Sequence, residues 1–193
     1  QWVSWLRSAA PYVHLHHGRT FVISFAGEVV ADRTLLNHLV MDVSLIASMG
    51  MRVVLVHGSR PQIEELMGLR KLEGQFYKGV RITGPQELEC VKEACGETRF
   101  DIEAAFSQGL PNTPMQHSRI KVVSGNFVTA RPMGIIDGVD YLHTGVVRKV
   151  DAESIQDLLS RGNIVLVSPT GFSPTGEAFN LTTEDVATAI AVA

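Results

Sequence analysis

Hydrophobic residues occur along this chain in two alternating patterns. Short, almost continuous apolar runs are typical of strands that are buried on both faces of a sheet. These runs are 20–25, 53–56 and 164–167. Longer stretches with apolar residues every three or four positions predict amphipathic helices. These stretches are 33–49, 61–67, 85–108 and 152–161. Strands and helices in this order, joined by short connections, predict an α/β fold, a three-layer α/β/α sandwich around a mainly parallel sheet.

Shorter extended segments predict a β-hairpin region inserted after Ser118. Those segments are 120–123, 127–130 and 139–147, and a separate extended segment at 76–82 predicts a hairpin strand. Prolines and glycines over 168–176 predict a loop. From Leu181 an apolar helix runs to the last residue without a stop signal, so we expect the fold to be truncated at its C-terminus.

The predicted helix boundaries rest on capping residues. Asp32 and Asp151 stand where a side-chain oxygen can accept from the first free N–H groups of a helix. Gly50 and Gly162 stand just past the last apolar position of a helix, where glycine readily takes a left-handed conformation.

The first seventeen residues form a separate predicted element. Trp2 and Trp5 share one stripe of a helical pattern, and Pro11 is expected to interrupt or kink that helix. An exposed stripe with two tryptophans needs an apolar partner. We expect a partner subunit to cover it, which makes residues 1–17 an oligomerisation helix and 18–193 the main domain. Packing on the chain's own domain is the alternative.

Composition narrows the classes of function. The 193 residues are 45% hydrophobic and 19% charged, so the chain can bury enough apolar surface to fold. The net charge is −3 with no basic stripe, which argues against nucleic acid as a partner. No apolar run reaches the ~18 residues of a membrane span, and the N-terminus has no signal-peptide pattern. A cytoplasmic location is expected, with a plastid as the alternative.

The two cysteines, Cys90 and Cys95, fall five residues apart in one predicted helix. That spacing places them on different faces and too far apart for a disulfide. We expect buried free thiols in a reducing compartment.

Glycine-containing turns follow three of the predicted strands, at 26–27, 58–59 and 169–171. Open α/β sheets bind ligands beyond the carboxyl ends of their strands. Glycine there lets backbone amides approach an anion, and a helix N-terminus adds its positive dipole end. Any one of these could be only a tight turn, but three at one edge of a sheet favour a ligand cleft.

Four segments together resemble the amino-acid kinase fold. They are residues 21–27, 54–60, 79–83 and 180–185. Within that fold the chain is similar to the acetylglutamate kinase branch, and most similar to the kinase-like N-terminal domain of bacterial-type N-acetylglutamate synthases. Residues 57–64 and 173–177 resemble signatures of those synthases. The resemblance covers essentially the whole chain.

The departures from the kinase pattern imply a cleft that has lost its chemistry. Active family kinases carry lysine at the position of Ser24, glycines at Ser59 and Arg60, and aspartate at Glu184. Phosphoryl transfer depends on positioning and charge stabilisation, so losing the lysine should cost several kcal/mol of transition-state stabilisation. The larger residues at 59 and 60 should put bulk where backbone would touch phosphate. We expect no catalytic residue and no metal ligand in this chain.

Other residues of the implied cleft keep the family pattern. Gly27 and Gly58 belong to the two strand-end turns, while Arg81 and Asn180 stand where the kinases hold their acylated amino-acid substrate. For Arg81 the alternative is a solvated charge on a hairpin.

The resemblance also implies the role of the whole protein. These synthases transfer acetyl from acetyl-CoA to L-glutamate in the first step of L-arginine biosynthesis, on a separate acetyltransferase domain that we expect to be missing here. L-arginine is implied as an allosteric inhibitor, and an N-terminal helix as the link that assembles a homo-oligomer, a hexamer. Tyr12 occupies the family's aromatic position beside the arginine site, next to the helix of Trp2 and Trp5. A plain interface aromatic is the alternative for Tyr12. No cofactor is expected in this chain.

Two other functions stay open: an active acetylglutamate kinase using ATP and magnesium, against which Ser24 argues, and a purely structural oligomerisation domain. Other site patterns are weaker. His14, His16 and His17 have no further ligands near them to complete a metal site. Ser24 and His57 are not accompanied by the Gly-x-Ser-x-Gly turn of the serine hydrolases.

Overall fold

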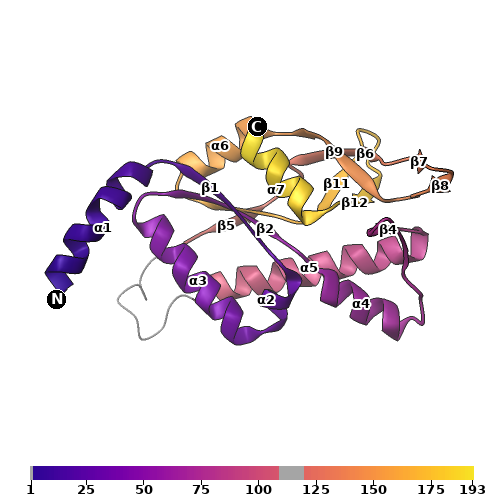
Figure 1. The fold of residues 1–193 in the computed structure, drawn as a ribbon, viewed down its shortest axis with the longest axis horizontal. Helices are drawn as coiled ribbons and strands as arrows, with labels where there is room; N and C mark the ends of the chain where they lie inside the picture. Colours follow the sequence, from indigo (N-terminus) through magenta and orange to yellow (C-terminus); the bar gives the residue numbers. More distant parts are fainter. Residues whose placement is uncertain (1, 109–119) are drawn as a thin grey trace.

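Four parallel strands form the central sheet. They lie in the order β1 (Thr20–Phe25), β2 (Arg52–His57), β10 (Ile164–Val167) and β5 (Val122–Ser124). The computed structural model that shows them describes residues 2–108 and 120–193 (Figure 1). The three apolar runs of the sequence are thus three of the four strands, and the prediction of a mainly parallel sheet is confirmed.

Helices cover both faces of this sheet, because successive side chains of a strand point to opposite faces. Val53 and Leu55 pack with α3 (Arg33–Ser48) and α5 (Pro85–Ser107) on one face. Val54 and Val56 pack with α6 (Ala152–Ser160) and α7 (Thr183–Val192) on the other face. All four side chains are at most 1% exposed, and each such burial stabilises the fold by about 1.5–3 kcal/mol. The predicted three-layer α/β/α sandwich is confirmed.

A second four-stranded sheet lies against the α6 and α7 side. Its order is β12 (Ala178–Asn180), β11 (Thr170–Phe172), β6 (Val128–Pro132) and β9 (Gly145–Val150). The prediction of a loop over 168–176 is wrong for residues 170–172, because β11 pairs antiparallel with β12, while residues 173–176 form the turn between these strands. Strands of three residues are too short to show an alternating pattern. In the predicted hairpin region after Ser118, residue 119 lies outside the described part of the chain. The antiparallel pairing of β6 with β9 confirms the later strands, whereas the predicted strand at 120–123 is wrong as a hairpin strand, because β5 pairs parallel with β10 in the central sheet.

Two small hairpins extend one end of the molecule. One joins β3 (Gln75–Tyr77) to β4 (Val80–Ile82), and the other joins β7 (Ile135–Ile136) to β8 (Val139–Asp140). Lys78 pairs with Asp137 at 2.5 Å, which links the two hairpins. The rings of Tyr77 and Tyr141 also meet edge to face, 6.4 Å apart.

The helix α4 (Arg60–Leu69) packs on α5 through a separate apolar cluster that contains both cysteines. Cys90 and Cys95 are buried and free, as expected. Burial raises the pKa of the Cys95 thiol to about 11, so this group stays protonated at neutral pH.

The predicted helix caps are confirmed. The carboxylate of Asp32 accepts from the backbone N–H groups of residues 34 and 35, and that of Asp151 accepts from residue 154. Gly50 and Gly162 have φ angles of 85° and 78°. One short helix, α2 (Gly27–Ala31), occupies what the sequence suggested was only a turn.

The first helix, α1 (Trp2–His16), projects from the body of the molecule (Figure 1). It continues through Pro11, so the predicted interruption does not occur. Contacts with the body lie at its C-terminal end, where the His16 ring meets Phe21 at 5.5 Å and His17 Nδ1 lies 3.2 Å from the carbonyl oxygen of Met49. Elsewhere α1 presents large apolar side chains to solvent. They are Val3, Trp5, Tyr12 and Leu15, each more than 60% exposed.

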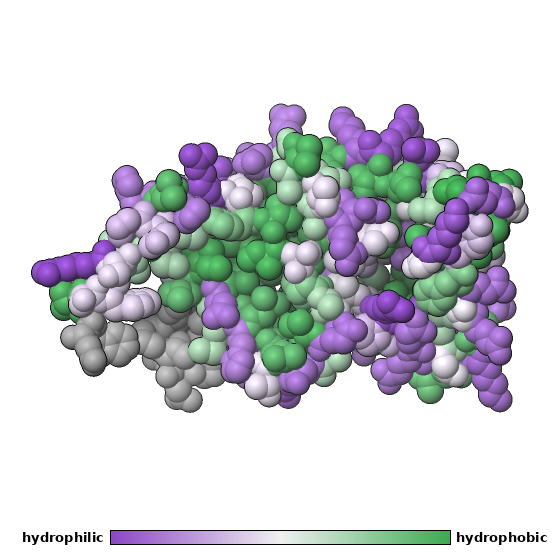
Figure 2. All heavy atoms as spheres, in the orientation of Figure 1, coloured by the Kyte–Doolittle hydropathy of each residue, from purple (hydrophilic) through white to green (hydrophobic). Residues whose placement is uncertain are grey.

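Hydrophobic side chains also gather in a band across the middle of one face, over β1 and between α3 and α7 (Figure 2). The strand β1 is an edge of the central sheet, which leaves one side of its backbone unpaired among the described residues.

Candidate functional site

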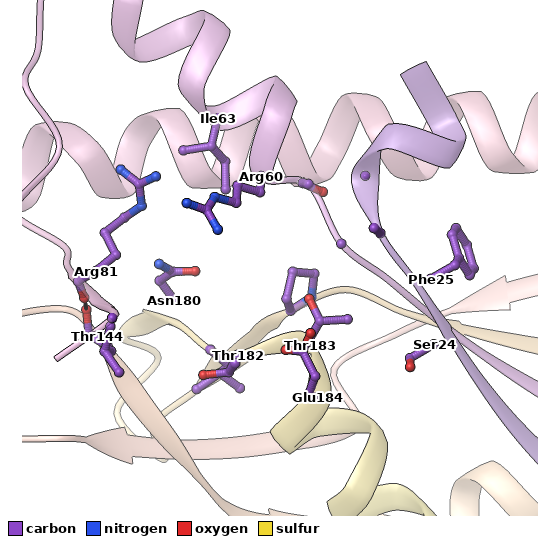
Figure 3. A pocket seen from close by; sticks show the side chains of 18 of the residues that line it. Ser24, Phe25, Arg60, Ile63, Arg81, Thr144, Asn180, Thr182, Thr183 and Glu184 are labelled. Atoms are coloured by element: carbon purple, nitrogen blue, oxygen red, sulfur yellow. Dashed lines mark hydrogen bonds between the residues drawn. The ribbon is translucent and has the colours of Figure 1, made fainter. Parts of the chain in front are cut away.

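A cleft of about 510 Å³ lies beyond the carboxyl ends of β1 and β2, between the β3–β4 hairpin and the start of α7 (Figure 3). All the residues that the sequence placed in a ligand cleft line it. They are Ser24, Gly27, Gly58, Ser59, Arg81, Asn180 and Glu184. The fold therefore brings together positions that are far apart in the sequence. Arg60, Phe76, Thr144 and Thr183 also line the cleft, and the sequence had assigned none of these four a role in binding.

The glycines at the cleft are required by close packing. A Cβ on Gly27 would lie 2.8 Å from Cδ of Pro61 and 3.0 Å from Cα of Ser59. A Cβ on Gly58 would lie 3.0 Å from the backbone nitrogen of Gly27. The β1–α2 and β2–α4 connections thus press on each other. The third predicted turn behaves differently, because Gly171 lies in β11 and only Pro169 of that turn reaches the cleft.

Arg81 is held as a buried cation at the wall of the cleft. Its side chain is 9% exposed, so the alternative of a solvated hairpin charge is wrong. The guanidinium donates to the carboxylate of Glu64 and to Sδ of Met67, the latter at 3.1 Å, and lies 4.7 Å from the centre of the Phe76 ring. These contacts hold the group at the wall of the cleft (Figure 3).

The side chains of Ser59 and Arg60, which stand where the kinases carry glycines, point in different directions. Ser59 is 2% exposed, and its hydroxyl lies 3.2 Å from both Nδ1 of His57 and Oγ1 of Thr98. Its bulk is therefore turned inward, contrary to the expectation that it would fill the phosphate position. Arg60 does extend into the cleft (Figure 3), 5.9 Å from the Phe76 ring. Among the described residues Arg60 takes part in no ion pair.

Two helices begin at the cleft without a side-chain cap. Ser59 precedes α4 and Thr182 precedes α7, and neither side chain accepts from its helix. Free backbone N–H groups and the positive ends of both helix dipoles therefore face the cleft. Glu184, in the first turn of α7, and Glu28 are acidic residues that also line the cleft. Arg60, Arg81 and these helix ends suit a ligand with anionic groups.

His57, at the end of β2, is fully buried beside the cleft. Burial is the main cause that lowers its pKa to about 4, with a smaller effect from Arg99, so the ring is neutral at pH 7. Its Nε2 lies 2.8 Å from Oγ of Ser168, and its Nδ1 faces Gly58 and Ser59. Among the described residues Ser24 is not one of its hydrogen-bond partners, so the two side chains do not form a hydrolase-like pair.

The predicted oligomer and arginine residues lie away from this cleft, on α1. Trp5 and Tyr12 are exposed there, and neither lines the cleft. Trp2 belongs to the same helix, but its side chain lies outside what the structure describes. In the part of the chain that the structure covers, no helix is long and apolar enough to cross a membrane.

A three-layer α/β/α domain with a cleft at the carboxyl ends of parallel strands belongs to the class of open-sheet α/β proteins. The chain belongs, more specifically, to the amino acid kinase family, whose sequence pattern matches residues 19–193.

Comparison with known proteins shows which members of this family are similar in sequence. The amino-acid acetyltransferase of Ralstonia nicotianae is 61% identical over 193 residues, which are 100% of this chain and 43% of that protein. The amino-acid acetyltransferase of Ectopseudomonas mendocina is 51% identical over 191 residues, 99% of this chain and 44% of that protein. The chain thus spans less than half the length of these relatives.

Solved structures of an N-acetylglutamate synthase are also similar to this chain. N-acetylglutamate synthase from Neisseria gonorrhoeae, complexed with coenzyme A and L-arginine, superposes with a TM-score of 0.91 at 34% identity, over 100% of this chain and 45% of that chain. The same synthase with coenzyme A and N-acetyl-glutamate gives 0.88 at 34% identity, over 100% of this chain and 43% of that chain. Carbamate kinase from Giardia lamblia shares the fold alone, with a TM-score of 0.62 and 12% identity over 91% of this chain and 67% of that chain. This chain is an amino-acid-kinase-type domain similar to that of N-acetylglutamate synthases.

Proposed function

We propose that this chain is the regulatory and assembly part of an N-acetylglutamate synthase. The whole protein would transfer acetyl from acetyl-CoA to the α-amino group of L-glutamate, on an acetyltransferase domain that this chain does not contain. This chain would sense L-arginine, the end product, and build the oligomer. It would need no cofactor of its own.

One observation carries the proposal: the cleft has a serine at the position where active kinases of the family use a lysine for phosphoryl transfer. Ser24 takes the place of that lysine, and the cleft lining contains no lysine among residues 2–108 and 120–193. Arg60 occupies a position where phosphate would meet glycine backbone. A hydroxyl cannot neutralise the charge that develops on a transferring phosphoryl group, which is the main contribution that kinases make to the reaction. The cleft therefore suits binding better than phosphoryl transfer.

Inhibition by arginine would be a coupling free energy between two sites. Arginine would bind one global arrangement of the assembly more tightly than another, and the less active arrangement would become more populated. The N. gonorrhoeae synthase has been solved with L-arginine, which supports this class of ligand. The sequence-based assignment of Tyr12 to that site stays part of the proposal.

The exposed apolar side chains of α1 support the assembly role. Four large side chains more than 60% exposed on one projecting helix are unusual for a surface that remains in water. A second copy of the chain would cover them, and a hexamer is the assembly that we propose.

The decisive experiment uses the full-length protein that contains this chain. Release of CoA from acetyl-CoA is measured with and without L-glutamate, while L-arginine is titrated. ADP formation from ATP and N-acetyl-L-glutamate is measured in parallel. We expect glutamate-dependent CoA release that arginine suppresses, and no ADP above background.

Each other outcome changes the assignment. CoA release that is indifferent to arginine would leave this domain a purely structural one. ADP formation without CoA release would make the protein an active kinase and contradict the role assigned to Ser24.

A further inference from the structure

A chain of polar groups runs behind the cleft and joins three distant segments. Thr83 follows β4, Thr144 precedes β9, and Asn180 ends β12. Thr83 and Thr144 are only 0% and 4% exposed. Polar side chains are seldom buried this completely. Such groups are buried without loss of stability only when their hydrogen bonds are satisfied.

Four contacts connect these groups. Oγ1 of Thr144 lies 2.6 Å from the carbonyl oxygen of Arg81 and 2.9 Å from Oγ1 of Thr83. It also accepts from the backbone N–H of Thr83 at 3.1 Å. The side-chain nitrogen of Asn180 lies 3.0 Å from Oγ1 of Thr83.

The number of hydrogens available to these groups fixes which of them donates in each hydrogen bond. A carbonyl oxygen only accepts, and a hydroxyl has a single hydrogen, so the hydrogen of Thr144 goes to the carbonyl of Arg81. The contact between the two hydroxyls then requires the hydrogen of Thr83. With its hydrogen used, Thr83 can only accept from Asn180, so Asn180 must offer its NH₂ group to Thr83.

The side-chain oxygen of Asn180 is thereby turned toward the cleft. In Figure 3 its nitrogen lies on the side of Arg81 and Thr144, and its oxygen lies on the opposite side. We propose that Thr83 and Thr144 are positioning residues that lock the amide of Asn180, so that the cleft selects ligands with an N–H donor at that point.

The selectivity follows from the penalty for unpaired acceptors. A ligand that places an ester or ether oxygen against the fixed oxygen of Asn180 leaves two acceptors facing each other without a hydrogen. A site that is built to hydrogen-bond an N–H group rejects analogues that lack it much more strongly than an apolar pocket rejects a size change. The guanidinium groups of Arg60 and Arg81 would hold the anionic groups of the same ligand.

The first test needs no ligand. The full-length protein is labelled with ¹⁵N-asparagine, and the side-chain signal of Asn180 is assigned by its loss in Asn180→Asp. We expect one of its two amide hydrogens to exchange with solvent at least tenfold more slowly than the other, because only one bonds Thr83. In Thr83→Val the difference should disappear, while Thr83→Ser should keep it.

Equal and fast exchange of both hydrogens in the unsubstituted protein would overturn the proposal, because an amide turned the other way would leave both hydrogens in the cleft. This measurement does not depend on the folding of any Thr83 variant.

The second test measures selectivity, and it rests on the proposed role of the cleft as a ligand site. N-acetyl-L-glutamate and its ester analogue 2-acetoxyglutarate are titrated while the Asn180 signal is followed, which reports on this cleft alone. We expect half-saturation at a concentration at least tenfold lower for the N–H probe. Thr144→Val should bring the ratio near one, and Thr144→Ser should preserve it.

An equal loss of affinity for both probes in Thr144→Val would mean a merely structural residue and would overturn the selectivity. No shift with either probe would overturn the ligand assignment of the cleft. The exchange result would still decide whether Thr83 and Thr144 lock Asn180.

Discussion

The Nε2 atom of His57 lies 2.8 Å from Oγ of Ser168, and this contact joins the ends of two neighbouring strands, β2 and β10, beneath the cleft. The histidine is fully buried and neutral, with a pKa lowered to about 4, mainly by burial. A buried neutral histidine makes folding stability depend on pH.

We expect the free energy of unfolding to fall as the pH is lowered from about 6.5 to 4. In this window the unfolded chain binds a proton at His57 that the folded chain does not, so the stabilisation is complete only above the unfolded pKa. The loss should approach ~3 kcal/mol. Urea unfolding at several pH values measures it.

The control is His57→Gln, which keeps a polar side chain but cannot be protonated. It should remove this part of the pH dependence, whereas His38→Gln, at an exposed position on α3, should leave it unchanged. If the free energy of unfolding of His57→Gln depended on pH as strongly as that of the unsubstituted protein, His57 would not be the group responsible.

Gly27→Ala should destabilise the fold by about 1–3 kcal/mol, because the new Cβ would press on Pro61 and Ser59. The matched control is Gly96→Ala in the middle of α5, where a Cβ meets nothing within 4 Å. There alanine should stabilise by about 0.5–1 kcal/mol through helix propensity. Chemical denaturation compares the two, and equal effects would show that the connections around the cleft are looser than described.

Arg81→Ala should lower stability by about 1–3 kcal/mol, since it removes a buried guanidinium that pairs with the half-exposed Glu64 and stacks on the Phe76 ring. Arg148→Ala, at an exposed position of β9, should change stability by less than about 0.5 kcal/mol. Thermal and urea unfolding would measure both. If the two substitutions cost the same, Arg81 is not held as the structure indicates.

Trp5→Ser and Tyr12→Ser should shift the protein toward smaller assemblies in light scattering. Both side chains are more than 60% exposed in the single chain, so removing them should cost that chain little stability. The matched control Phe100→Ser replaces another exposed aromatic side chain, on α5 rather than α1. It should leave the size of the assembly unchanged. An unaltered assembly size in both α1 variants would remove this helix from the interface.

The local pattern of hydrophobic and capping residues was sufficient to predict much of the fold. The runs at 53–56 and 164–167 predicted buried strands, since a parallel strand must be apolar on both faces when helices cover it. Asp32 and Asp151 predicted helix starts because a cap acts within three residues of its own position. The cleft residues were found by resemblance to family motifs, and their convergence follows from the parallel order of β1 and β2.

The amino-acid sequence by itself therefore determined the long helices, the buried parallel strands, their caps and the family. Only the tertiary structure decided which long-range partners these elements meet: β11 with β12, the inward turn of the Ser59 hydroxyl, the burial of Arg81 against Glu64, and the contact of Thr83, Thr144 and Asn180. The reason is physical. Periodicity and capping act over a few residues, whereas the direction of a side chain and the partner of a short strand depend on atoms brought near by packing. Thr83 and Asn180, for example, lie 97 residues apart in the chain.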